Sequence, residues 1–115
     1  MTRFVLAAII AAVLVQRDVP ESDLLRGFAF SKCLAEGYKG RNDSFAQDAR
    51  HVAELYRDAG RTSRPDVYTR LQALAQSAKP GEPAAIDQSN LTIMKCLELY
   101  EGAALKKLVK SETAR

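Results

Sequence analysis

Histidine, cysteine and tryptophan are scarce in this 115-residue chain, which has one His, two Cys and no Trp. The sequence also lacks the C-x-x-C, H-E-x-x-H and G-x-S-x-G patterns and any glycine-rich phosphate loop. A metal site needs several convergent ligands, and a Cys–His catalytic pair needs an activated thiolate. The sequence therefore predicts no catalytic residue, no metal and no cofactor. We interpret the single histidine, His51, as a surface residue.

The chain also lacks a strong excess of charge of one sign. It has 17 Lys and Arg against 14 Asp and Glu, and two of the basic residues, Arg3 and Arg17, precede residue 18. The remaining charges are nearly balanced and interleaved along the chain. Because nucleic-acid binding needs a one-sided basic patch, we do not expect a nucleic-acid partner. The length suits one domain.

A run of apolar residues, Phe4–Val15, follows the basic Arg3 at the N-terminus. This run fits the apolar region of a signal peptide and falls short of the ~20 residues that a membrane-spanning helix needs. We expect residues 1–17 to be a signal peptide with a weak cleavage site, and residues 18–115 to form the mature domain. The alternatives are a buried N-terminal helix and a segment retained as a weak anchor. No other association with a membrane is expected.

No run after this segment alternates apolar and polar residues as a half-buried strand would. Helical patterns cover Leu24–Tyr38, a second segment that begins at Asp43 or Ser44 and stops at Gly60, and a third that Ser63 and Pro65 open. Lys79–Pro83 is the strongest break, and helix resumes near Asp87–Asn90 and breaks or kinks at Gly102. The sequence thus predicts a small all-α, single-domain bundle of about four to five helices.

Two of the expected helices are apolar on nearly every side, which is typical of a buried helix. These are Leu24–Tyr38 and the segment around Leu91–Tyr100. The others have one apolar face each. On the second helix this face is Phe45, Ala49, Val52, Ala53 and Tyr56; on the third it is Val67, Leu71, Leu74 and Ala75; on the last it is Ala104, Leu105, Leu108 and Val109.

Cys33 and Cys96 lie in the middle of the two most apolar helical segments. They could be two unpaired buried thiols, since free Cys behaves as a small hydrophobic residue. Export favours a disulfide, because disulfides persist in the periplasm and outside the cell. Two cysteines allow one intramolecular pairing. Such a bond would close a long loop and contribute on the order of 4 kcal/mol in the chain-entropy model.

Two motifs around these cysteines resemble a known family. They are FSKCLAEGYK at Phe30–Lys39, followed by Asp48 and Ala49, and MKCLELY at Met94–Tyr100. Their order and spacing resemble the fourth family of type VI secretion amidase immunity proteins, over roughly Leu24–Lys110. That family has a Cys-Ile/Leu-Ala-x-x-Tyr-Lys element near its start and a Lys-Cys-Leu-Asp/Glu-x-Tyr element near its end.

The resemblance implies a periplasmic, all-helical protein that acts as a homodimer. It implies that the partner is a secreted cysteine amidase of papain-like fold, which cuts the γ-D-glutamyl–diaminopimelate bond of the cell-wall peptide. The immunity protein would block the active-site groove of this amidase. The resemblance also implies that Cys33 and Cys96 form a structural disulfide.

A protein that blocks a groove needs a protruding, pre-organised element, because ordering a loop on binding costs affinity. The proline-stiffened segment Ser77–Gln88 and the exposed side of the third helix fit this requirement. The candidate partner-binding residues are Arg64, Asp66, Tyr68, Arg70, Lys79, Glu82 and Asp87. Alternatively, the segment is a plain connector and Tyr68 lies at the edge of the core.

Two other functions remain open from the sequence. The first is a periplasmic helical adaptor or structural protein with an unknown partner. The second is a small exported enzyme or ligand carrier, although the chain has few large side chains with which to line a cavity.

Overall fold

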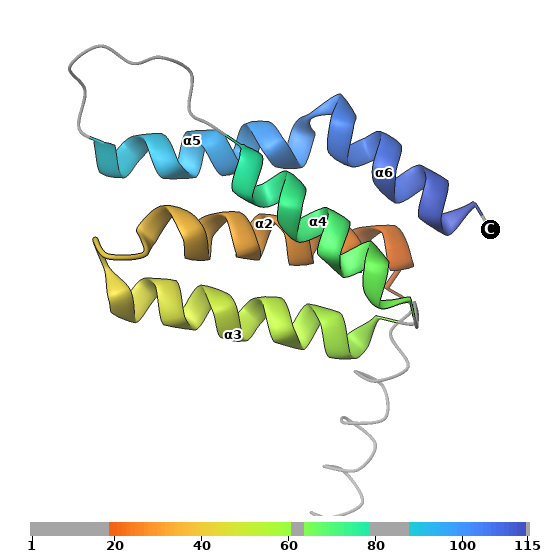
Figure 1. The fold of residues 1–115 in the computed structure, drawn as a ribbon, viewed down its shortest axis with the longest axis horizontal. Coiled ribbons are helices and arrows are strands. Elements are labelled where there is room, and N and C mark those ends of the chain that lie inside the picture. Colours follow the sequence, from red (N-terminus) through yellow and green to blue (C-terminus); the bar gives the residue numbers. More distant parts are fainter. Residues whose placement is uncertain (1–18, 61–63, 79–87, 115) are drawn as a thin grey trace, which may run out of the picture.

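The computed structural model describes residues 19–60, 64–78 and 88–114, with the side chains of residues 88–90 left aside (Figure 1). Within these residues the chain is helical and contains no strand, which confirms the all-α prediction. The predicted signal peptide, residues 1–17, lies outside the described residues. The helices are α2 (Glu21–Tyr38), α3 (Asp43–Ala59), α4 (Pro65–Ser77), α5 (Gln88–Glu101) and α6 (Ala103–Thr113).

The helix ends follow from local chemistry. The side chain of Asn42 accepts a hydrogen bond of 3.1 Å from the backbone N–H of Phe45 and so caps the start of α3. The turn before it needs Gly40, whose φ of 77° lies in the left-handed region that other residues rarely adopt. Pro65 begins α4 at a position where its missing N–H costs nothing. The starts of α3 at Asp43 and of α4 at Pro65 confirm the predicted starts of these two helices.

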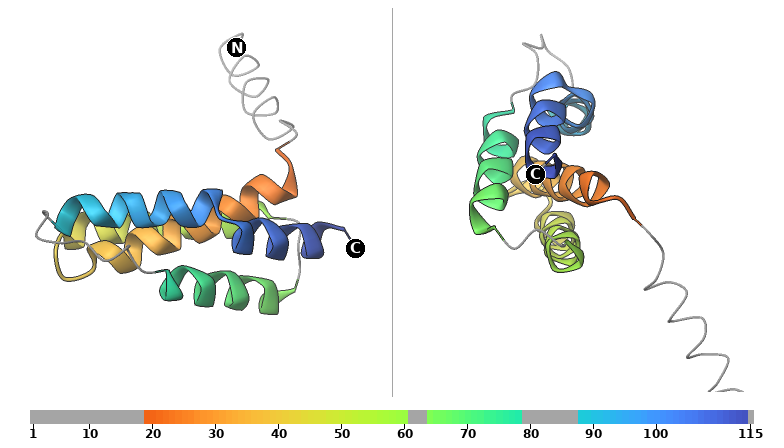
Figure 2. Two further views of the ribbon diagram at one scale, coloured as in Figure 1. Left: turned by 90° about the horizontal axis from the view of Figure 1, so that it is seen from above. Right: turned by 90° about the vertical axis from the view of Figure 1, so that its right-hand side faces the viewer.

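Helix α2 is the centre of the bundle. It packs against α3, α4, α5 and α6. The end-on view in Figure 2 shows α3, α4 and the α5–α6 pair arranged around three sides of α2. The prediction that α2 is buried is therefore confirmed for three of its sides. The fourth side of α2 faces out of the bundle between α3 and α5.

The core lies between α2 and these neighbours and has two parts that meet at Leu99. One part surrounds Phe28 on α2, whose ring lies edge-on to Tyr68 of α4 with ring centroids 5.0 Å apart. The other part surrounds Cys33 and Cys96. Helix α6 contributes to the first part, whose buried members are Leu25, Phe28, Ala29, Ala53, Val67, Tyr68, Leu71, Leu105 and Val109.

Helix α3 contacts α2 through small side chains. Its fully or nearly buried residues are Ala46, Ala49 and Ala53. Gly27 of α2 adds to the close approach, because a Cβ there would lie 2.5 Å from the ring of Tyr56. The two backbones therefore pack closely, and the larger side chains of α3 extend beyond the contact.

The predicted apolar face of α3 is only partly buried. Ala49 and Ala53 are in the core, but Phe45 and Val52 remain 42% and 41% exposed. The physical reason is that, in the part of the chain that the structure describes, no helix besides α2 packs along α3 to cover these two side chains. Similarly, α5 buries Cys96 but exposes other apolar residues on its outward side.

Cys33 and Cys96 form a disulfide that joins α2 to α5, with Cα atoms 5.7 Å apart. The prediction of this bond is confirmed. Both residues are fully buried. Next to the bond, Gly37 leaves room for the side chain of Thr92, and Arg41 donates a hydrogen bond of 3.2 Å to the Thr92 hydroxyl. The disulfide thus lies within a tightly packed contact of the two helices.

A second link holds the other end of α5. Arg26 of α2 donates a hydrogen bond of 2.9 Å to the backbone carbonyl of Tyr100, and its guanidinium lies 4.1 Å from the centre of the Tyr100 ring. This carbonyl is near the end of α5, where helix backbone acceptors lack intrahelical partners. Gly102 separates α5 from α6, as predicted. Arg26 and the disulfide therefore fix α5 on α2 at two places.

We expect the disulfide to supply a large part of the folding stability. It closes a loop of 63 residues, so a Cys33→Ala/Cys96→Ala variant should lose about 4 kcal/mol of unfolding free energy. Urea unfolding of the oxidised protein and of this variant measures the difference. A loss below about 1 kcal/mol would show that the loop constraint matters little to the unfolded chain.

Candidate partner-binding surface

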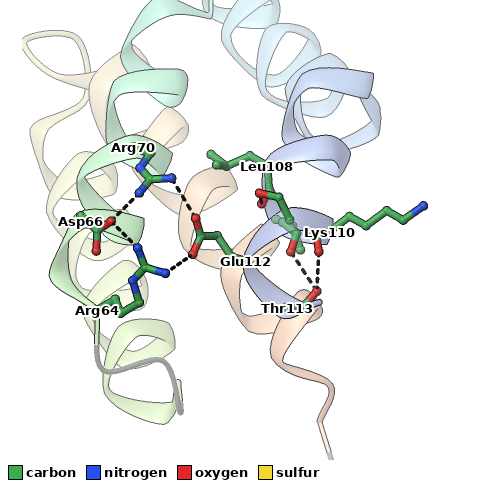
Figure 3. Close-up of polar contacts among 9 residues, drawn as sticks. Arg64, Asp66, Arg70, Leu108, Lys110, Glu112 and Thr113 are labelled. Carbon is green, nitrogen blue, oxygen red and sulfur yellow. Dashed lines mark hydrogen bonds and ion pairs between the residues drawn. The ribbon is translucent and has the colours of Figure 1, made fainter. Parts of the chain in front are cut away.

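A charged cluster joins α4 to α6 (Figure 3). Asp66 pairs with Arg64, which directly precedes α4, and with Arg70 of α4: its carboxylate is 3.1 Å from Arg64 and also accepts a hydrogen bond from Arg70. The same two arginines reach Glu112 of α6. The Arg70–Glu112 pair is 2.8 Å long and the Arg64–Glu112 pair is 3.7 Å long.

The four members of this cluster differ in exposure. The side chain of Glu112 is 2% exposed, whereas the side chains of Arg64, Asp66 and Arg70 are 41%, 47% and 46% exposed. Burial raises the pKa of the Asp66 carboxyl, but hydrogen bonds from Arg64 and Arg70 and their positive charges outweigh it and hold the pKa below the usual 3.8. Asp66 is therefore ionised at neutral pH. The ion pairs to the buried Glu112 hold the cluster in one geometry, while the side chains of Arg64, Asp66 and Arg70 remain partly exposed to water.

The cluster continues into a shallow hollow between α4 and α6. Asp66, Arg70, Ala73 and Ser77 follow one another at helical spacing on this side of α4. The hollow has a volume of about 440 Å³ and lies beside Arg70 and Leu108. Its lining is mainly apolar, and it extends to Ser77, where α4 ends. We call the side chains of Asp66, Arg70, Ala73 and Ser77 the α4 stripe.

The prediction that Tyr68 lies on the exposed side of α4 is wrong. The residue is 5% exposed, and its ring contacts Phe28 in the core. The guanidinium of Arg57 lies 5.1 Å from the ring centre on the other side. Burial raises the pKa of the Tyr68 hydroxyl, the charge of Glu21 raises it further, and Arg57 opposes the change. The reason for the error is that Tyr68 follows Val67 on the face of α4 that turns towards α2.

The structure thus brings together three of the predicted surface residues, Arg64, Asp66 and Arg70. Lys79, Glu82 and Asp87 lie outside the described residues.

Glu112, which pairs with both arginines, is not among the residues predicted from the sequence. A signal for it existed: Glu112 falls at helical spacing from Leu105 and Leu108, on the apolar face of α6. A carboxylate at such a position is rarely buried without a cationic partner.

In the described part of the chain, no group of three or more His, Cys, Asp or Glu is placed to hold a metal ion. No helix among residues 19–60, 64–78 and 88–114 is long and apolar enough to cross a membrane. His51 lies exposed on α3, as predicted.

A disulfide-linked helical bundle with a polar cluster on its surface does not by itself define a function, because one fold can serve many functions. Comparison with known families is more specific. Residues 23–109 match the Tai4 family, described as amidase immunity proteins of the type VI secretion system. This match covers most of the chain and both cysteine motifs, so the protein belongs to that family, as the resemblance implied. A search of curated proteins finds no significant match.

We expect Tyr68 to act in stability rather than in binding. Tyr68→Ala should lower the unfolding free energy by about 3 kcal/mol, because it removes a buried aromatic ring. Tyr68→Phe should change it by less than about 1 kcal/mol, since the buried hydroxyl has no hydrogen-bond partner among the described residues. Thermal and urea unfolding measure both. A large loss in the Phe variant would mean that the hydroxyl has a stabilising partner.

Loss of the buried carboxylate of the cluster should destabilise the protein more than loss of the exposed one, as measured by thermal and urea unfolding. Glu112→Ala should lower the free energy of unfolding by about 2 kcal/mol, because it removes the contacts that hold α6 on α4. Asp66→Ala should cost less than about 1 kcal/mol, as is usual for exposed ion pairs. Equal losses for the two variants would contradict this account of how the cluster is held.

Proposed function

We propose that this protein is a periplasmic immunity protein that binds a type VI secreted peptidoglycan amidase and blocks its active-site groove. The observation that carries the proposal is the family match over residues 23–109. The proposal names the inhibited enzyme by class: a cysteine amidase that cuts peptide bonds of the cell wall. Protection of the producing cell from itself or from sibling cells follows from this inhibition.

The disulfide supports the periplasmic location. Such bonds persist in oxidising compartments and are rare in the cytosol. Cys33 and Cys96 are both buried and paired, and the structure has no free cysteine among its described residues. We propose that residues 1–17 direct export. A secreted amidase acts on the cell wall, so an inhibitor must be present in the same compartment.

The surface that we propose for amidase binding is the α4 stripe with Arg64 and the Ser77–Gln88 segment. The salt bridges to Glu112 fix the two arginines before any partner arrives, so binding loses little side-chain entropy. Arginine is also among the residues that most often contribute to interface energy. Lys79, Glu82 and Asp87 remain proposed members of this surface, and Tyr68 is withdrawn from it.

The family also leads us to propose that the protein acts as a homodimer. The alternative function is a periplasmic adaptor or structural protein. Such a protein would share export and the disulfide, but it would not inhibit a hydrolase.

The proposal is tested by exporting a type VI secreted cysteine amidase of the producing bacterium into the periplasm of a bacterial host and following lysis. Co-export of this protein should prevent lysis. Ala73→Arg should weaken amidase binding by at least about 10-fold, because it places a bulky charged group on the α4 stripe without removing an existing contact. Isothermal titration calorimetry measures the affinity.

Two control variants make the test specific. Ala103→Arg is the same change at an exposed position of α6 outside the stripe, and His51→Ala removes the single histidine on α3. Both should bind the amidase as the unchanged protein does. If folded, exported protein gives no protection, immunity against this amidase is excluded and the adaptor function is favoured. If protection holds but Ala73→Arg binds normally, the amidase binds another surface.

A further inference from the structure

Helix α5 buries little of its own apolar surface. Among its described side chains, only Thr92 and Cys96 are buried. Ile93, Met94 and Leu97 are between 46% and 55% exposed. Because most of the stability of a helix in a protein comes from the packing of its apolar face, α5 depends on other links to its neighbours.

Two links attach α5 to α2, at different places along the helix. The disulfide between Cys33 and Cys96 lies in the middle of α5, and the hydrogen bond from Arg26 to the carbonyl of Tyr100 lies near its end. The partly buried Leu99 adds an apolar contact between them. A covalent bond does not open by thermal motion, whereas a single hydrogen bond does. The disulfide is therefore the main attachment of α5.

Helix α6 follows α5 through a tight corner at Gly102. The backbone N–H of Gly102 donates a hydrogen bond of 3.1 Å to the carbonyl of Leu99. A Cβ at Gly102 would lie 2.9 Å from the carbonyl oxygen of Glu98, so the corner has no room for a side chain. The position of α5 therefore sets the direction in which α6 leaves the corner.

The far end of α6 contains Glu112, the buried member of the charged cluster. Its carboxylate lies 2.8 Å from Arg70 and 3.7 Å from Arg64 (Figure 3). Leu105 and Val109 hold the earlier turns of α6 in the core, and Glu112 lies about one turn beyond them. Its position thus depends on how α6 lies as a whole.

These contacts form one connection from the disulfide to the α4 stripe. We propose that the disulfide fixes the two arginines of the charged cluster through α5, α6 and Glu112, so that the amidase-binding surface is complete only in the oxidised protein. The part of this statement that concerns the amidase rests on the proposed function. The connection confines inhibition to the compartment in which a secreted amidase acts.

Oxidation occurs by thiol–disulfide exchange with an incoming disulfide of the periplasm. The thiolate of one cysteine attacks that disulfide, and the second cysteine then displaces the mixed disulfide. Cys33 and Cys96 together lose two electrons and two protons, and the incoming disulfide gains them and leaves as two thiols. Before export, the reducing cytosol keeps both cysteines as thiols, and α5 lacks its main attachment.

The test is a double-mutant cycle on the affinity for the type VI secreted cysteine amidase of the producing bacterium. Cys33→Ala/Cys96→Ala removes the disulfide, and Glu112→Gln removes the charge that holds the arginines. Loss of the disulfide should weaken amidase binding at least about 10-fold when Glu112 is present and less than about 2-fold in Glu112→Gln protein, because the connection is already broken there. Isothermal titration calorimetry without reductant measures each affinity, and circular dichroism confirms that each variant is folded.

Glu98→Gln is the matched control for this cycle. It removes the same charge from an exposed position of α5, outside the charged cluster. In Glu98→Gln protein, loss of the disulfide should keep its full effect on amidase affinity.

A second measurement does not need the amidase. Amide hydrogen exchange, followed by mass spectrometry, compares the oxidised protein with Cys33→Ala/Cys96→Ala. Exchange should become at least about 10-fold faster in α5 and α6 and change less than about 2-fold in α3, because α3 packs mainly against α2. If this variant does not fold, Gly102→Ala keeps the disulfide but disturbs the corner. It should speed exchange in α6 and not in α5, and it should weaken amidase binding.

Three results would overturn the proposal. Equal losses of amidase affinity with and without Glu112 would show that the disulfide acts only on overall stability. Exchange that rises equally in all helices would show the same. Normal amidase binding by folded protein without the disulfide would refute the connection and leave the immunity function intact. If the unchanged oxidised protein does not bind the amidase, the proposed function fails, and the exchange pattern alone decides whether the disulfide positions α6.

Discussion

The burial of α2 is the constraint on which the rest of the structure depends. This helix is apolar on nearly every side, and a small chain has few elements with which to cover it. Helices α3, α4 and the α5–α6 pair cover three sides (Figure 2). The disulfide holds α5 in this arrangement by joining it directly to α2. Among the described residues, no helix covers the fourth side of α2, between α3 and α5 (Figure 2).

Two surfaces of the bundle differ in chemistry because they arise in different ways. The α4 stripe is largely polar, and Glu112 of α6 holds Arg70 and the neighbouring Arg64 in place. Such groups are well solvated, so this surface is stable in water without a partner. The outer side of α3 exposes apolar side chains because α3 contacts α2 through alanines, which leaves Phe45 and Val52 outside the contact.

Much of the fold could be predicted from the sequence because its signals are local. Gly60 and Pro65 mark helix ends through the chemistry of the backbone groups beside them. The disulfide could also be predicted, since two cysteines in apolar helices of an exported chain have one possible pairing. The motifs around Cys33 and Cys96 led to the correct family.

The candidate site was less predictable, because helical periodicity shows which residues share a face but not which face meets a neighbour. Tyr68 was assigned to the surface although α4 turns it towards Phe28, and Glu112 was overlooked although two arginines of α4 meet it. The sequence by itself determined the helices, their ends, the cysteine pairing and the family, since each depends on nearby residues or on a motif. The tertiary structure decided which apolar faces are covered and which charges pair, because these depend on contacts between helices far apart in the chain.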